Sequence, residues 1–144
     1  MQEENEILKK NITLKRFEEY DLKKISNPEE MIKIQEFTKK IYLSKPIEDY
    51  IVRLIDATRY PEKYKISLGH YIEWGCSPRG SIGLYIGSKA EAIIQGSNYV
   101  TAAHVKNVAY DVMRHRILLN YEGQAENIKT DDIIKEILQK VPAP

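Results

Sequence analysis

Residues 75–94, which read GCSPRGSIGLYIGSKAEAII, decide the fold of this chain. The pair Ser77-Pro78 is typical of a helix start, because serine can cap free backbone N–H groups and proline fits the first helical position. Apolar side chains then recur at helical spacing, at Ile82, Ile86, Ala90, Ile93 and Ile94. We therefore predict a helix that begins at Ser77, ends near Gly96 and turns this apolar stripe toward the core.

Two more helices are predicted before this stretch. The first begins at Asn27-Pro28, where Asn27 can be the N-cap and Glu30 the acid of a capping box. Its apolar stripe consists of Met31, Ile34, Phe37 and Ile41. The second begins near Ser44 to Pro46, ends before Pro61 and buries Ile47, Ile51, Leu54, Ile55 and Thr58. A weaker pattern of Ile7, Leu8, Ile12 and Phe17 predicts a further helix near the N-terminus.

Two helices are also predicted after this stretch. Thr101 is the expected N-cap of one, whose inward side chains are Val105, Val108, Ala109, Val112 and Met113. Thr130 is the expected N-cap of the other, whose apolar side chains are Ile134, Ile137, Leu138 and Val141. The acids Asp131 and Asp132 suit the positive end of its dipole.

The pattern as a whole predicts an all-α fold. Residues 60–76 are polar and rich in aromatics, which favours a loop, and the chain contains no alternating run that would predict a sheet. Short amphipathic helices must then bury their stripes against one another, in a compact bundle of five to six helices. Such a bundle would serve equally as a DNA reader, an adaptor or a lid.

The amino-acid composition narrows these three functional classes. The 22 basic and 21 acidic side chains leave a net charge of +1, which disfavours nucleic acid and anionic membrane as partners. The sequence contains no apolar run of about 20 residues, the length that spans a bilayer. With one cysteine, Cys76, and three separated histidines, no disulfide or zinc-ligand pattern is present, and a reducing cytoplasm fits best. We expect His70 in the loop and His104 on a solvent-exposed helix face.

Arg79 carries the main chemical signal. It falls in the first turn of the helix that begins at Ser77-Pro78, where a cation is unfavourable because the helix dipole is positive there. Three other predicted helices place acids at this position, whereas this one has no acid until Glu91. Free N–H groups beside a guanidinium suit a phosphate or a carboxylate, although a solvated surface arginine is the simpler interpretation.

Five motifs, in order, resemble the C-terminal lid domain of MoxR-type AAA+ ATPases over residues 27–144. Residues 75–80, GCSPRG, are similar to the sensor 2 motif of that family, usually Gly-Ala-Ser-Pro-Arg, with Cys76 in place of alanine. Residues 49–59, DYIVRLIDATR, resemble its helix ending in Ala-Thr-Arg. Residues 99–105, YVTAAHV, residues 114–119, RHRILL, and residues 141–144, VPAP, resemble later family segments.

The resemblance implies a lid that packs beside a nucleotide-binding α/β core, with Arg79 reaching the γ-phosphate of ATP and Ser77 and Pro78 beside it. It also implies Mg in the intact protein and rings of neighbouring subunits, which are usually hexameric in this family, although the ring size of this protein is left open. Chaperone-like maturation of client complexes and, often, a von Willebrand factor A domain partner are implied as well. Residues 1–26 would be a linker or helical segment that joins the missing core, and residues 27–144 the lid.

The chain itself lacks the parts that hydrolyse ATP. A P-loop needs Gly-x-x-x-x-Gly-Lys followed by Ser or Thr, and residues 83–89, GLYIGSK, have the wrong spacing and order. No Walker B strand is visible either, so we expect no turnover by this chain alone. Met1 would then mark an engineered or truncated start.

Several interpretations stay open at this stage. Cys76 is expected to be a small residue in a tight turn, and Arg59 either caps its own helix or fixes the lid to the core. Residues 114–116, RHR, either complement a helix dipole or form an interface. Two rival functions remain. One is a helix-turn-helix-like nucleic-acid binder, in which residues 100–119 would recognise the bases and phosphates would be contacted by Lys106, Arg114, His115 and Arg116. The other is a free-standing helical adaptor.

Overall fold

The computed structural model describes residues 3, 5, 6 and 23–144, which fall into two compact units, residues 1–34 and residues 35–144. Helix α2 (Pro28–Lys40) begins in the first unit and ends in the second. Its N-terminus is the predicted capping box: Asn27 Oδ1 accepts from the Glu30 N–H at 2.8 Å, and Glu30 Oε2 accepts from the Asn27 N–H at 3.3 Å. The predicted helix around Ile7 to Phe17 lies outside the described residues. Our boundary between residues 26 and 27 stays a prediction.

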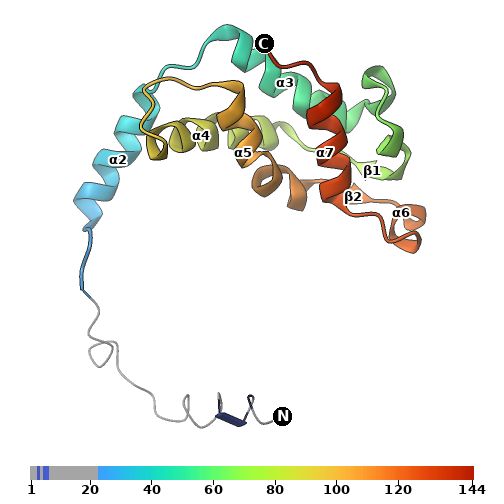
Figure 1. Ribbon diagram of the computed structural model, residues 1–144, viewed down its shortest axis with the longest axis horizontal. Helices are drawn as coiled ribbons and strands as arrows, with labels where there is room; N and C mark the ends of the chain where they lie inside the picture. Colours follow the sequence, from blue (N-terminus) through green and yellow to red (C-terminus); the bar gives the residue numbers. More distant parts are fainter. Residues whose placement is uncertain (1–2, 4, 7–22) are drawn as a thin grey trace. The chain divides into compact units, whose positions relative to one another are not determined.

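Helices α3 (Lys45–Arg59), α4 (Pro78–Ile94), α5 (Ala102–Met113) and α7 (Thr130–Lys140) pack on one another within residues 35–144 (Figure 1). Together with the short α6 (Tyr121–Ala125) and α2, they make six α-helices in the described part of the chain. The predicted helical fold class is confirmed. The largest fully buried side chains include Tyr50, Leu54, Leu84, Val105, Met113, Ile134 and Ile137.

Helix α3 buries every side chain that its spacing predicts. Pro46 lies in its first turn after the N-cap Ser44, and the backbone N–H of Tyr60 bonds to the Asp56 carbonyl at its end. Pro61 then begins a 3-10 helix, η2 (Pro61–Tyr64), because it cannot continue the α-helical hydrogen bonds. The buried residues are Ile47, Tyr50, Ile51, Leu54, Ile55, Ala57 and Thr58.

The prediction that an apolar stripe of α4 faces the core is wrong for three of its five residues, although Ile93 does pack partly buried against the core. Ile82 is 56% exposed, Ile86 55% and Ile94 80%. The buried face consists instead of Gly80, Leu84, Ser88, Lys89 and Ala92. The physical reason is that α4 packs mainly on α5 through small residues: Gly83 lies against Val112 and Gly87 against Val108. Close backbone approach decides this face, and glycines give no hydrophobic signal.

Two details at the starts of α5 and α7 also differ from expectation. His104 is buried rather than exposed, and its Nδ1 accepts a hydrogen bond from the Thr101 N–H at 3.1 Å, so it takes the place of the capping-box acid. In α7 the N-cap position belongs to Lys129, one residue before the predicted Thr130. Helix α2 departs from expectation as well: its apolar spacing predicted a stripe packed on the other helices, but none of the residues of α2 is buried.

The predicted loop at residues 60–76 is more ordered than expected. It contains η2, a second 3-10 helix η3 (Ser67–Tyr71) and the strand β1 (Ile72–Trp74). The strand β1 pairs antiparallel with β2 (Leu118–Leu119), with Ile72 opposite Leu119 and Trp74 opposite Leu118. These strands lie beside α6 at one end of the second unit (Figure 1). Strands of two or three residues are too short to leave a detectable alternation.

A single carboxylate fastens η3 to α7. Glu136 accepts from the backbone N–H of Ser67 at 2.7 Å and from that of Leu68 at 2.9 Å. Partial burial of Glu136 raises its pKa, but these backbone hydrogen bonds outweigh that effect and lower the pKa below its ordinary value. The carboxylate therefore stabilises the folded chain in its ionised form.

We predict that Glu136→Gln lowers the free energy of unfolding by about 1 kcal/mol at neutral pH, because an amide oxygen accepts more weakly than a carboxylate. A lowered pKa stabilises the fold above the ordinary value of 4.5, and this contribution is lost as the pH falls through the folded-state pKa. Urea denaturation of both proteins should therefore show the difference shrinking below pH 4.5. Glu62→Gln, at an exposed position, is the control. The prediction would be contradicted if the loss of unfolding free energy in Glu136→Gln did not change with pH, or if Glu62→Gln showed the same loss.

Candidate functional site

The start of α4 is held by a hydrogen bond from α3. Thr58 is buried, and its Oγ1 donates to the Ile55 carbonyl at 2.7 Å while it accepts from the Cys76 N–H at 2.8 Å. Two of the five motifs that carry the sequence resemblance, the one ending in Ala57-Thr58-Arg59 and the one at residues 75–80, are therefore joined by this threonine. A hydroxyl that both donates and accepts can link two segments in a buried position, which an apolar isostere could not.

Gly75 permits the close approach that this hydrogen bond needs. A Cβ atom at Gly75 would lie 2.3 Å from the Thr58 carbonyl oxygen and 2.9 Å from the Arg59 backbone nitrogen. Both contacts are with backbone, which cannot move aside as a flexible side chain could. Glycine at position 75 thus fixes the distance between the end of α3 and the start of α4.

The first turn of α4 has the features of an anion site. Ser77 occupies the N-cap position, but its side chain makes no capping hydrogen bond, contrary to our expectation. Pro78 is the first helical residue, and the turn contains no acid. Arg79 is exposed, and no hydrogen bond or ion pair joins it to another residue in the described part of the chain. Its guanidinium and the uncompensated helix dipole both favour a negative ligand.

Cys76 is a buried free thiol beneath this turn. Burial raises its pKa, and the hydroxyl of Thr58 and the charges of Arg116 and Arg59 oppose that rise. The Cβ position at Gly80 would lie 3.1 Å from the Cys76 Cβ, so little space surrounds the side chain. These contacts agree with a small residue in a tight turn.

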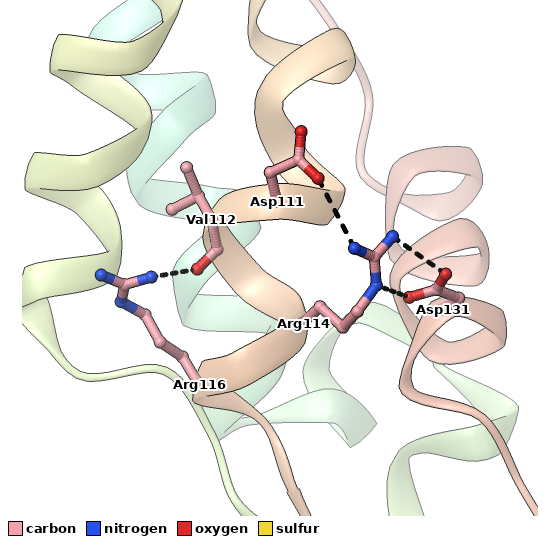
Figure 2. Close-up of polar contacts among 5 residues, drawn as sticks. All are labelled: Asp111, Val112, Arg114, Arg116 and Asp131. Atoms are coloured by element: carbon pink, nitrogen blue, oxygen red, sulfur yellow. Dashed lines mark hydrogen bonds and ion pairs between the residues drawn. The ribbon is translucent and has the colours of Figure 1, made fainter. Parts of the chain in front are cut away.

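Residues 114–116 form a 3-10 turn, η4 (Arg114–Arg116), whose two arginines point to opposite sides of α5 (Figure 2). Arg114 donates through Nε to Asp131 Oδ1 at 2.6 Å and through Nη2 to Asp131 Oδ2 at 3.0 Å. This bidentate pair links the end of α5 to α7 and lowers the pKa of the Asp131 carboxyl. Arg114 therefore has a role within the fold, while the two interpretations of residues 114–116 that the sequence left open stay predictions.

Arg116 turns toward α4 instead (Figure 2). Its Nη1 donates to the Val112 carbonyl at the end of α5 and also contacts His115 Nε2. Arg59 lies at the C-terminus of α3, where the helix is capped by a backbone hydrogen bond from Tyr60 rather than by the Arg59 side chain. The sequence alone did not associate either arginine with the start of α4.

A shallow apolar groove runs between α3 and α4. It has a volume of about 440 Å³ and is lined by exposed or half-exposed side chains, among them Val52, Ile82, Tyr85 and Ile86. Sequence reasoning missed it, because it assigned Ile82 and Ile86 to the core. Among the described residues, no group of three or more His, Cys, Asp or Glu side chains could hold a metal ion, and no helix is long and apolar enough to cross a membrane.

Comparison with known proteins defines the class. Residues 69–137 match the model of the AAA lid domain. A crystal structure of a protein assigned as an ATPase, from Cytophaga hutchinsonii ATCC 33406, is similar with a TM-score of 0.83 and 36% identity, and covers 99% of this chain and 43% of that one. These residues thus form a helical lid domain of the AAA+ class.

The relatives define the family. Chaperone MoxR1 of Mycobacterium tuberculosis (strain ATCC 25618 / H37Rv) is 32% identical over 123 residues, which are 85% of this chain and 33% of that protein. YeaC of Bacillus subtilis (strain 168), an uncharacterized protein, is 28% identical over 116 residues, 81% of this chain and 34% of YeaC. The chain is a lid domain of a MoxR-family AAA+ ATPase, and it spans about a third of the length of these curated relatives.

We predict that Gly75→Ala lowers the free energy of unfolding by about 2 kcal/mol or more, because its Cβ would overlap the Thr58 carbonyl. Gly87→Ala is the matched control: its Cβ would lie 3.6 Å from the nearest atom of Val108, and alanine is the better helix former by about 1 kcal/mol. It should leave stability unchanged or raise it. Equal unfolding free energies for the two variants in urea denaturation would refute the close-approach argument.

Proposed function

We propose that this lid contributes Arg79 to ATP binding and hydrolysis by the nucleotide-binding core of the intact protein. The observation that supports this proposal is Arg79 itself, an exposed guanidinium in an acid-free first turn of α4 that has no hydrogen-bond or ion-pair partner in the described part of the chain. During phosphoryl transfer, negative charge spreads over the γ-phosphoryl oxygens, and an arginine aimed there stabilises the transition state. Ser77 and Pro78 begin the same helix and so place its positive N-terminal end beside the same ligand, although Pro78 itself has no N–H to donate.

The same contact would couple nucleotide state to movement of the lid. Arg79 lies at the start of α4, and α4 packs along α5. A displacement of Arg79 by its ligand would therefore move both helices together. Loss of the γ-phosphate removes a charged hydrogen bond, which changes the preferred angle between lid and core. In the intact protein this movement drives chaperone-like remodelling or maturation of client complexes.

The partners that this function requires follow from the family. A nucleotide-binding core in the same chain supplies the P-loop and the Mg ligands, and neighbouring subunits complete a homo-oligomeric ring. A von Willebrand factor A domain partner and a cytoplasmic location stay predictions. One observation favours the adaptor alternative, namely the exposed apolar groove between α3 and α4. The nucleic-acid alternative loses one of its phosphate contacts, since Arg114 is paired with Asp131.

We expect Arg79→Ala to reduce ATP turnover of the intact protein about 100-fold, the usual cost of removing one transition-state hydrogen-bond donor. The free energy of unfolding should change by less than about 0.5 kcal/mol, because Arg79 has no partner within the described lid. The measurements are steady-state ATPase rates and thermal unfolding. Lys106→Ala, on the exposed face of α5, is the control and should leave turnover unchanged.

Turnover that survives Arg79→Ala would contradict the proposal and return attention to the adaptor function. The nucleic-acid alternative makes a different prediction, since Lys106→Ala would then weaken salt-sensitive binding to duplex DNA. The isolated chain should hydrolyse no ATP.

A further inference from the structure

Two arginines of one short turn use their guanidinium groups differently. In Arg114 the edge formed by Nε and Nη2 is filled by the two carboxylate oxygens of Asp131. In Arg116, Nη1 makes both side-chain contacts, with the Val112 carbonyl and with His115. Its Nε and Nη2 have no partner in the described part of the chain. The edge that binds a carboxylate in Arg114 is therefore open in Arg116.

The contacts of Arg116 place this open edge near the start of α4. Its guanidinium is held at the carbonyl of Val112, and the side chain of Val112 packs against Gly83, one turn beyond Arg79. Figure 2 shows the group on the α4 side of α5, away from Asp111 and Asp131. The charge of Arg116 also acts on the Cys76 thiol, which lies directly before Ser77-Pro78-Arg79.

Charge at this end of the bundle is unbalanced. Arg59 ends α3, Arg79 lies in the first turn of α4 and Arg116 follows α5, and the charges of Arg59 and Arg116 both act on Cys76 at the start of α4. Within the described residues none of the three forms an ion pair with a carboxylate. Three acids of α3, α5 and α7 are engaged elsewhere: Asp56 accepts from Lys63 and Tyr64, and Asp111 and Asp131 accept from Arg114. Like charges beside the positive end of a helix repel one another unless an anion joins them.

We propose that Arg116 is a second anion-binding arginine of this site, which uses its Nε and Nη2 edge to hold a phosphate group of the nucleotide that Arg79 contacts. Two adjacent N–H donors match two oxygens of a phosphate as they match a carboxylate. The inference rests on the proposed function of Arg79, and it adds a residue from α5 to a site otherwise built from α4. Both arginines would then hold phosphate groups of the nucleotide, Arg79 from α4 and Arg116 from the turn after α5.

The test is nucleotide affinity of the intact ATPase, measured with a fluorescent ATP analogue and a fluorescent ADP analogue. Arg116→Gln should weaken binding of both about 10-fold, the usual effect of losing a hydrogen bond to a charged group. Arg116→Lys keeps the charge and a donor for Val112 but lacks the fork, so it should fold normally and still bind more weakly. Arg114→Gln is the matched control: it breaks the Asp131 pair and lowers the unfolding temperature, but leaves nucleotide affinity unchanged.

The outcomes separate the two proposals. If Arg116→Gln and Arg116→Lys keep wild-type affinity while Arg79→Ala still abolishes turnover, Arg116 has only a structural role and the inference is overturned alone. If neither position affects nucleotide binding or turnover, both proposals fail. An affinity loss in Arg114→Gln equal to that in Arg116→Gln would attribute the effect to the stability of η4 and would also overturn the inference.

Discussion

The hydrogen bond from the Cys76 N–H to Thr58 Oγ1 is the contact on which the arrangement of this lid depends. It fixes the end of α3 against the start of α4, and it forms only because Gly75 lets two backbone segments meet. Since α4 then packs along α5, the position of the first turn of α4 is set by buried, satisfied polar groups rather than by a flexible loop. A site built on such a junction is well ordered before any ligand arrives.

The junction also concentrates positive charge. The chain is nearly neutral as a whole, with a net charge of +1. Yet Arg59 at the end of α3, Arg79 at the start of α4 and Arg116 after α5 have no carboxylate partner in the described residues. Arg114, two residues from Arg116, is fully paired in a bidentate contact. This contrast within one turn indicates that local pairing, and not net charge, distinguishes an arginine that holds the fold from one available to a phosphate.

Part of the site was predictable from the sequence, because its signals are local. Ser77-Pro78 predicted where α4 begins, and the missing acid in its first turn singled out Arg79. The assignment of Arg79 to a nucleotide stays a proposal. Arg116, Gly75 and Thr58 could not be placed by such reasoning, because their roles depend on contacts between segments far apart in the chain. The hydroxyl of Thr58, for example, meets a backbone group 18 positions away.

By itself, the sequence determined the helical class, the start of α2, the bounds of α3 and the start of α4, since caps, prolines and apolar spacing act within one or two turns. Only the tertiary structure decided which face of α4 is buried. Gly83 and Gly87 bring α5 close, so Ile82 and Ile86 remain exposed although their spacing favoured the core. The burial of His104 and the pairing of β1 with β2 were decided in the same way, because packing between segments outweighs the local preferences that a sequence pattern records.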